Sequence, residues 1–210
     1  MKEEKTEEQN LPWLDLRLSK EAMDYLWDDI NGKQTDVRKK LAGNISKSVE
    51  IQDKNNWFYE NVLKHCAETI YKDWDNYYNV HVAKSAPPPV YELRELWVNY
   101  QKQHEFNPPH KHLDCLFTFV VFMKIPTHWK EQHALPISAN SAAPNASDFQ
   151  FLLGQGMGPV QNIDFPLCPE DEGRMLFFPA WLYHQVFPFY ECEEERITIS
   201  GNIIPANTQI

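Results

Sequence analysis

The sequence lacks the features that define several large classes of protein. No Cys-x-x-Cys pair occurs, so neither a zinc knuckle nor a disulfide framework is indicated. The four cysteines are scattered at Cys66, Cys115, Cys168 and Cys192. No stretch approaches the roughly 18 consecutive apolar residues of a membrane-spanning helix, and the charged N-terminus MKEEKTEEQN has no apolar segment typical of a signal peptide. We therefore expect reduced thiols, no membrane association and a cytoplasmic location, in the host cytoplasm if the source is viral.

Positive charge is also scarce. The chain has 20 Lys and Arg against 30 Asp and Glu, a formal net charge of -10. A protein that binds duplex nucleic acid neutralises phosphates with clustered Lys and Arg, so this class is not expected. The acidic runs, of which residues 193–195 are the longest, are typical of a solvated surface. No internal repeat is present.

The length and the apolar content indicate one compact domain. With 210 residues and 42% hydrophobic content, the chain can bury one sizeable core but is short for two domains. We expect residues 1–85 to form a helical extension with supporting helices. Ser19 can cap a helix that follows it, and residues 55–74 repeat apolar side chains at three- and four-residue steps. These helices should pack on one face of a sheet that belongs to a core spanning residues 86–210.

The character of the sequence changes after the proline run at residues 86–89, because proline removes a donor and fixes its backbone angle. Short β-rich segments separated by turn residues follow, without intervening helices, which is typical of a sandwich or a barrel. The segments are YELRELWVNYQ, LFTFVVFMKI, DFQFLL, RMLFFP, LYHQVFPF and RITISGNII. Residues 127–147 read as a long loop that covers a pocket, and residues 154–158 as a hairpin turn.

Residues 107–114, NPPHKHLD, place three metal-ligand side chains at alternate positions: His110, His112 and Asp114. Alternate residues of an extended chain point to the same side. Any adjacent pair of the three is therefore able to bind one metal ion. The pattern alone leaves open which pair does so.

A third ligand and an anion-binding group are available further along the chain. His184 lies between two β-rich segments, where a barrel wall would aim it inward. Two His and one carboxylate form the facial triad of non-haem Fe(II) oxygenases, which leaves positions open for a cosubstrate and O2. Arg196 lies on a segment whose alternation puts Thr198 and Ser200 on the same face. A buried arginine is costly unless a carboxylate meets it, and a dicarboxylate cosubstrate would do so in a bidentate pair.

These segments resemble a known family. WVNYQKQHEFNPPHKH, FTFVVFMKIP, MLFFPAWLYHQVFPF and ERITISGNI occur in the order and spacing of the 2-oxoglutarate/Fe(II)-dependent oxygenases of bacteria and their viruses, within the prolyl-hydroxylase-like superfamily. The resemblance covers about residues 97–204. It implies a mainly β fold with a double-stranded β-helix (jelly-roll, cupin-like) core. It also implies a dioxygenase that uses Fe(II), 2-oxoglutarate and O2, hydroxylates a substrate, and releases succinate and CO2.

The resemblance also assigns roles to residues. His184 is implied as a metal ligand, and Arg196 as the anchor of 2-oxoglutarate. The superfamily's usual His-x-Asp motif matches His112 and Asp114, whereas similar sequences often show His-x-His, which would match His110 and His112. We prefer His112, Asp114 and His184 as the metal ligands, because a carboxylate offsets the charge of Fe(II). His110 is then the alternate ligand, or lies next to the metal site.

Further pocket residues are expected on the strands that carry these groups. Thr198 and Ser200 should help Arg196 to bind the cosubstrate, and Asn99 and Tyr100, with Trp97, should line the pocket on the strand before the metal motif. The substrate is expected to be a small molecule or a peptide, with a prolyl residue as one candidate. The protein is expected to be a monomer or a homodimer.

Three other readings fit parts of the pattern. A non-catalytic cupin-like module would bind a metal or a small acid without oxidising anything. A structural protein that has lost its metal would have no reason to keep His112, Asp114, His184 and Arg196 together. A zinc hydrolase would need a general base and gives Arg196 no role.

Overall fold

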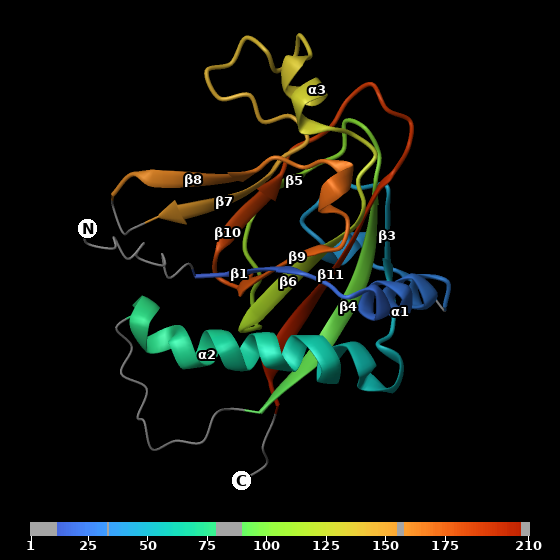
Figure 1. The fold of residues 1–210 in the computed structure, drawn as a ribbon, viewed down its shortest axis with the longest axis vertical. Coiled ribbons are helices and arrows are strands. Elements are labelled where there is room, and N and C mark those ends of the chain that lie inside the picture. The colour runs from blue at the N-terminus through green and yellow to red at the C-terminus, as the bar shows by residue number, and fades with distance from the viewer. Residues whose placement is uncertain (1–11, 33, 79–89, 155–157, 207–210) are drawn as a thin grey trace, which may run out of the picture.

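The structure, a computed structural model, describes residues 12–32, 34–78, 90–154 and 158–206, except for the side chains of residues 73–78 (Figure 1). The predicted break at residues 86–89 and three residues of the predicted hairpin turn, 155–157, lie outside the described residues. Two antiparallel sheets form the centre of the protein. The mainly β, double-stranded β-helix fold is confirmed.

The larger sheet has seven strands in the order β1-β9-β6-β11-β4-β3-β2. Their bounds are β1 Leu14–Arg17, β2 Thr35–Asp36, β3 Lys47–Glu50, β4 Tyr91–Gln101, β6 Phe117–Lys124, β9 Arg174–Pro179 and β11 Arg196–Pro205. The sequence predicted β4, β6, β9 and β11. It did not predict β1, β2 and β3, which are short and lie in the region expected to be helical. Because β1 pairs with β9 and β3 pairs with β4, the N-terminal region supplies edge strands as well as helices. The division near residue 85 stays a prediction.

The smaller sheet has four strands in the order β5-β10-β7-β8. Their bounds are β5 Asn107–His110, β7 Phe149–Gly154, β8 Val160–Phe165 and β10 Tyr183–Val186. Strand β5 follows β4 in the chain, but it crosses to the other sheet and pairs with β10. This crossing brings the NPPH segment beside the strand that contains His184.

The described residues form three α-helices beside the sheets, α1 Lys20–Ile30, α2 Lys64–Tyr78 and α3 Trp129–Ala134. The Ser19 side chain accepts a hydrogen bond from the Ala22 backbone N–H at 3.2 Å, so the predicted cap is confirmed. A π-helical turn, η3 Tyr59–Leu63, leads into α2, and short 3-10 turns occur at η1 Arg38–Lys40, η2 Lys54–Asn56 and η4 Pro169–Asp171. Within the predicted loop, only α3 is helical (Figure 1). No α-helix in the described part of the chain is both long and apolar enough to cross a membrane.

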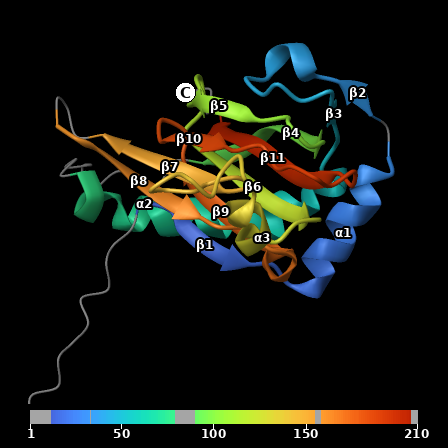
Figure 2. The same cartoon turned by 90° about the horizontal axis from the view of Figure 1, so that it is seen from above.

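The two faces of the large sheet bury different cores. On one face, Phe117, Phe119 and Val121 of β6 pack with side chains of α1 and α2, as predicted for the helices. On the other face, Val120 and Phe122 belong to a second core that includes the small sheet. Figure 2 shows α1 and the β7–β8 hairpin at opposite ends of the molecule. A cavity opens between the two sheets.

Candidate metal and cosubstrate site

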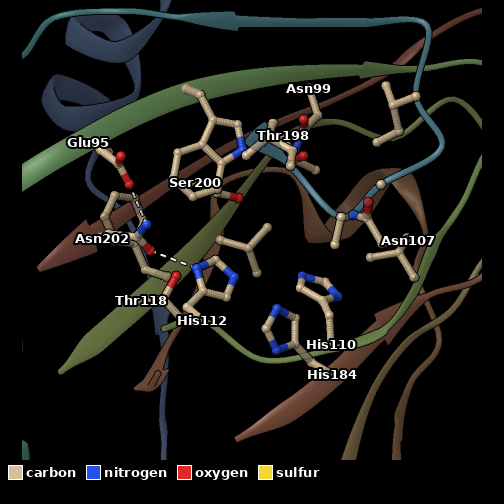
Figure 3. A pocket seen from close by; sticks show the side chains of 18 of the residues that line it. Glu95, Asn99, Asn107, His110, His112, Thr118, His184, Thr198, Ser200 and Asn202 are labelled. Carbon is tan, nitrogen blue, oxygen red and sulfur yellow. Dashed lines mark hydrogen bonds between the residues drawn. The ribbon is translucent and has the colours of Figure 1, made fainter. Parts of the chain in front are cut away.

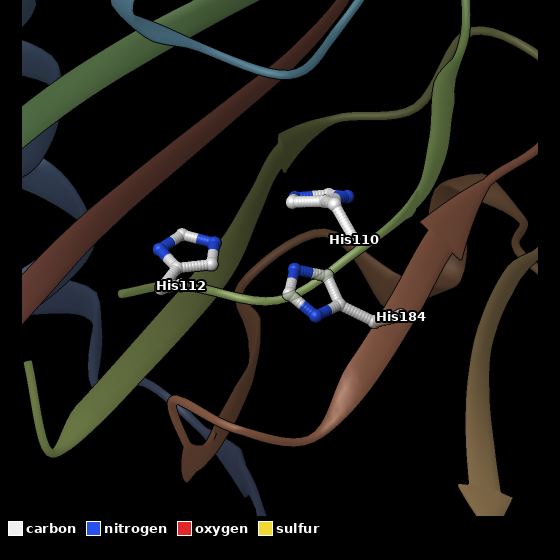
Figure 4. Close-up of side chains that lie close together, drawn as sticks. All are labelled: His110, His112 and His184. Carbon is white, nitrogen blue, oxygen red and sulfur yellow. The ribbon is translucent and has the colours of Figure 1, made fainter. Parts of the chain in front are cut away.

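Three histidines that line this cavity lie close together: His110 and His112 from β5 and the residues after it, and His184 from β10 (Figure 4). His110 of β5 and His184 of β10 occupy paired positions on neighbouring strands, and their ring centroids lie 4.2 Å apart. The His112 ring centroid lies 5.5 Å from that of His110 and 5.3 Å from that of His184. One ring nitrogen from each lies within 4.8 Å of the others. The cluster therefore has the composition and the closeness of a metal site.

Hydrogen bonds orient all three imidazoles in the same way. Each Nδ1 lies 2.7 to 2.9 Å from an oxygen atom that can only accept: the carbonyl of Pro108 for His110, Oδ1 of Asn202 for His112, and the carbonyl of Leu182 for His184. Nδ1–H must therefore be the donor in each ring. In a neutral imidazole the other nitrogen then holds a free lone pair, so all three Nε2 atoms are in the state that binds a metal.

A carboxylate supports one of these rings through an amide. The Asn202 Nδ2 donates to Glu95 Oε2 at 2.7 Å, which fixes the amide so that Oδ1 faces His112 (Figure 3). The indole of Trp97 stacks on the other side of His112, with ring centroids 6.0 Å apart. His112 is thus held in orientation by a hydrogen-bonded chain and by packing.

Burial keeps the histidines neutral. The pKa of His112 falls to about 4, mainly because burial disfavours the charged imidazolium, and the pKa of His184, which is 5% exposed, falls well below its usual value for the same reason. Burial also lowers the pKa of His110. Neutral imidazoles are the metal-binding form, so near pH 7 the site is ready for a cation without first losing protons.

The structure does not bring Asp114 into this cluster, contrary to the preferred ligand set. The chain leaves the extended conformation after His110, and Asp114 is exposed with a left-handed φ of 60°. The alternation that would have aimed Asp114 at the metal therefore does not continue. Its backbone carbonyl instead accepts a hydrogen bond from Arg94 Nη1 at 2.9 Å. The alternate ligand, His110, is the residue that joins His112 and His184.

At another part of the same cavity lies Arg196, which is fully buried. Its Nη2 donates to the Ser147 carbonyl at 2.8 Å and to the Ser147 hydroxyl, and Cζ lies 5.2 Å from the centre of the Phe189 ring. Nε and Nη1 are buried and have no hydrogen-bond partner among the residues that the structure describes. Burial lowers the pKa of Arg196 to about 10, while the negative charge of Asp148 opposes this shift. A cation whose donors are unpartnered is suited to bind an anion.

The cavity between the histidines and Arg196 measures about 360 Å³. Its floor includes Thr198, Ser200 and Asn99, which the sequence predicted to lie there (Figure 3). Strand pairing sets polar side chains opposite one another along this floor, with Thr198 facing Asn99 and Asn202 facing Glu95. The Trp97 indole also lines the cavity, and in the described part of the chain its buried Nε1 has no hydrogen-bond partner.

Tyr100 does not line the cavity, contrary to the prediction. Adjacent residues of a strand point to opposite faces, so Asn99 and Tyr100 cannot both face one pocket. The Tyr100 ring belongs to the core under the helices and lies 3.7 Å from Lys47 Nζ. Burial raises its pKa. Tyr100 therefore stabilises the large sheet from its other face.

Three residues that support the site, Asn202, Glu95 and Ser147, were not predicted from the sequence. Asn202 continues the alternation of Arg196, Thr198 and Ser200, so that pattern would have found it. Glu95 is identified only by the pairing of β4 with β11, which places it opposite Asn202. Ser147 lies in an irregular segment and carries no sequence signal that relates it to Arg196.

Loss of the Asn202 bond should weaken metal binding. We expect Asn202→Leu to raise the Kd for Co(II) or Fe(II) by about 10–100-fold, as is typical when the hydrogen-bond partner of a ligating histidine is lost. Anaerobic titration calorimetry measures this. Glu95→Gln is the matched control, because a glutamine oxygen still accepts from Asn202; an equal loss in that variant would assign the effect to the charge of Glu95 rather than to the orientation of His112.

Stability without metal should fall in mild acid. The folded-state pKa of His112, about 4, lies below the ordinary value of 6.5, so its contribution to stability is present above pH 6.5 and is lost as the pH falls towards 4. We expect a loss on the order of 2 kcal/mol from this group between pH 7 and 4.5. Urea unfolding across this range measures it. His112→Asn should flatten the slope, and an unchanged slope would contradict the assignment.

Comparison with known proteins places the chain in a family. Residues 95–202 match the family model described as "Putative 2OG-Fe(II) oxygenase". The match covers more than half of the chain, which therefore belongs to this family of Fe(II)- and 2-oxoglutarate-dependent oxygenases. The protein is an enzyme of this class, and Fe(II), 2-oxoglutarate and O2 are the cofactor and cosubstrates that the class uses. No curated protein matches the chain.

Solved structures agree on the fold. A 2OG-Fe(II) oxygenase family oxidoreductase from Burkholderia pseudomallei aligns with a TM-score of 0.57 at 9% identity, covering 93% of this chain and 86% of the other. A prolyl hydroxylase from Trichoplax adhaerens, in complex with a peptide fragment of hypoxia inducible factor, aligns at 0.52 and 11%, covering 92% and 84%. HygX from Streptomyces hygroscopicus, with nickel, 2-oxoglutarate and hygromycin B bound, aligns at 0.51 and 9%, covering 93% and 84%.

Proposed function

We propose that this protein is a hydroxylase in which His110, His112 and His184 hold Fe(II) and Arg196 anchors 2-oxoglutarate, with succinate and CO2 as the products of the cosubstrate. The observation that carries the proposal is that one cavity contains both a cluster of metal-binding nitrogens and a buried cation that has no ion pair among the described residues. One ring nitrogen of each histidine lies within 4.8 Å of the other two, and Arg196, whose Nε and Nη1 have no hydrogen-bond partner among the described residues, lines the same cavity. A metal ion and a dicarboxylate would satisfy both.

The protein's own groups account for the binding of the cosubstrate. Arg196 neutralises one carboxylate, and its N–H donors replace the water that the carboxylate loses. The hydroxyls of Thr198 and Ser200 lie on the same face of β11 and add neutral donors along the floor. Phe149 and Phe178 pack against His184 and keep water from that side of the cluster. Fe(II), when bound, supplies the activation of O2 and the oxidation of a C–H bond.

A dianionic cosubstrate also makes a three-histidine site reasonable in charge. Three neutral imidazoles leave the ion with its full double positive charge. The carboxylate of 2-oxoglutarate that is not paired with Arg196 offsets part of this charge. Glu95 adds a negative charge one hydrogen bond beyond His112, through Asn202. Glu95 thus supplies, from a greater distance, the negative charge that was expected from Asp114.

The substrate class is proposed to be a small molecule or a peptide. One similar fold holds a peptide fragment and another holds hygromycin B, so the fold accommodates both kinds of ligand. In this chain the cavity mouth carries the exposed side chains of Lys40, Lys111 and Leu113. Trp97 Nε1 offers one further donor beside His112.

The proposal is tested by adding Fe(II) and 2-oxoglutarate to the protein without O2 and recording the absorbance of the metal–keto acid complex, then admitting air and measuring succinate. We expect the absorbance band in the wild type and its loss in His184→Ala. Succinate release without added substrate would give direct support. If neither Fe(II) nor 2-oxoglutarate binds, the proposal fails and a non-catalytic cupin-like module becomes the better description.

A further inference from the structure

Ser147 lies in a backbone conformation that serine seldom adopts. Its φ is 77°, in the left-handed region, and the residue is fully buried. Such a conformation costs on the order of 1 kcal/mol or more for a residue with a side chain, and persists only where surrounding contacts enforce it. These contacts are present. The Ser147 N–H donates to the Pro188 carbonyl at 2.9 Å, and the Phe187 N–H donates to the Asp148 carbonyl at 2.9 Å.

The next residue adds a second anchor. The carboxylate of Asp148 lies 2.9 and 3.0 Å from Nε2 of His133 on α3, and it is 1% exposed. The end of the long connecting segment is therefore fixed to α3 on one side and to residues 187–188 on the other. Phe189, which packs against the Arg196 guanidinium, directly follows this second contact.

As a result of this arrangement, Ser147 presents two hydrogen-bond acceptors to the Arg196 guanidinium. The carbonyl and the hydroxyl of Ser147 both accept from Nη2, which has two hydrogens. Because the hydroxyl accepts there, its own hydrogen is free to be donated to Thr127 Oγ1, which lies 3.1 Å away. Two of the five guanidinium N–H groups are then used, and three remain, on Nε and Nη1. Among the described residues, Arg196 lines the cavity and Ser147 does not.

We infer that Ser147 is a positioning residue for the cosubstrate: it binds Arg196 from behind and so presents Nε–H and Nη1 to the distal carboxylate of a 2-keto dicarboxylic acid. The inference rests on the proposed role of Arg196 and deepens it. Ser147 touches neither the metal ligands nor the cavity. It acts only through the orientation of the guanidinium. Its loss should therefore weaken the binding of keto acids that reach Arg196 and of no others.

The test compares two keto acids on the Co(II)-loaded protein by titration calorimetry. 2-Oxoglutarate has the distal carboxylate and pyruvate lacks it. In Ser147→Gly, which tolerates the positive φ and keeps the carbonyl but removes the hydroxyl, we expect the Kd for 2-oxoglutarate to rise roughly three- to tenfold, the effect of one lost hydrogen bond. The Kd for pyruvate should not change. Thr127→Val, which removes the partner of the Ser147 hydroxyl, should give a smaller rise with the same selectivity.

Controls separate positioning from folding. Ser141→Ala changes a serine of the same connecting segment, whose hydroxyl accepts from the Ala143 N–H at 3.1 Å, and should leave both affinities unchanged. Ser147→Ala also removes the hydroxyl but retains the unfavourable φ that glycine tolerates, so it should lose the same affinity as Ser147→Gly and be less stable than that variant. If Ser147→Gly binds 2-oxoglutarate as the wild type does, or weakens both keto acids equally, the inference is wrong.

A second readout does not depend on the cosubstrate. Slow rotation of the Arg196 guanidinium about its Cζ–N bonds can be followed by ¹⁵N NMR in the protein without ligand. We expect rotation to become faster in Ser147→Gly and to stay unchanged in Ser141→Ala. If the wild type bound no 2-oxoglutarate while the rotation changed as expected, the proposed function would fail but the Ser147–Arg196 interaction would stand. Unchanged rotation in Ser147→Gly would overturn the interaction itself.

Discussion

His110→Ala should abolish tight metal binding, whereas Asp114→Ala should leave it unchanged. The reason is geometric: His110 places Nε2 within 4.8 Å of the ring nitrogens of His112 and His184, while Asp114 lies on the exposed turn beyond them. A lost ligand should cost more than the roughly 10–100-fold that is typical for a lost hydrogen-bond partner of a ligand. Anaerobic titration of each variant with Co(II), monitored by calorimetry and by the visible spectrum, measures the difference in metal affinity.

The matched control is His65→Ala, which removes an exposed histidine of α2 far along the chain from the site. Its metal affinity should equal that of the wild type, and the circular dichroism of all three variants should show the same fold. Equal losses in His110→Ala and Asp114→Ala would indicate a turn that rearranges to bring the carboxylate to the metal. A loss in Asp114→Ala alone would restore the ligand set His112, Asp114 and His184.

The position of Asp114 shows where the alternation of side chains along a strand no longer predicts a shared face. The sequence places His110, His112 and Asp114 at a period of two, and this period predicts a shared face only while the backbone stays extended. Two prolines precede His110, and β5 ends at that residue. His112 remains near His110 because the turn has only begun, with its N–H bonded to the Ala180 carbonyl at 2.9 Å. Asp114 has already turned away. The end of a short strand is a tertiary feature, and no pattern in the sequence marks it.

The floor of the cavity was more predictable. Strand β11 is long and regular, so the alternation of Arg196, Thr198 and Ser200 holds through Asn202. The same rule, applied to β4, separates Asn99 from Tyr100 and would have removed the error at Tyr100. What the sequence could not supply is the pairing between strands, because register depends on contacts across more than a hundred residues. Glu95 became visible as a partner of Asn202 only through that register.

Helices α1 and α2 and the longer strands followed from local patterns, whereas α3, in the predicted loop, and several short strands did not. Ser19 and the apolar repeat after it are local signals, and they predicted α1. Strands β1 and β3 have four residues each, LDLR and KSVE, with too few apolar positions to stand out. They form because β9 and β4 offer free edges for pairing. Long-range pairing therefore decided the short strands that accompany α1 and α2 in the region predicted to be helical.

Replacing Arg196 with methionine should nearly abolish the binding of 2-oxoglutarate while leaving the protein at least as stable as the wild type. Truncating one partner of a buried charge pair costs about 2–5 kcal/mol, so we expect the Kd for 2-oxoglutarate to rise by roughly thirtyfold or more. Without ligand, however, the buried guanidinium has Nε and Nη1 unpartnered, and burial lowers its pKa to about 10. An apolar side chain of similar length removes the cost of burying this charge, which offsets the loss of the Nη2 bonds to Ser147.

Weaker binding of 2-oxoglutarate without a loss of stability distinguishes a binding residue from a structural one. Calorimetry with 2-oxoglutarate and with pyruvate measures the first effect, and pyruvate, which lacks the distal carboxylate, should bind the Co(II)-loaded variant as it binds the wild type. Thermal unfolding without ligand measures the second. Arg174→Met is the comparison, because Arg174 is paired with Asp15 at 2.6 Å and its loss should reduce stability without affecting either keto acid. If Arg196→Met instead lowers the Tm sharply and weakens both keto acids alike, then Arg196 holds the sheets together through Ser147, and the distal carboxylate must be bound elsewhere in the cavity.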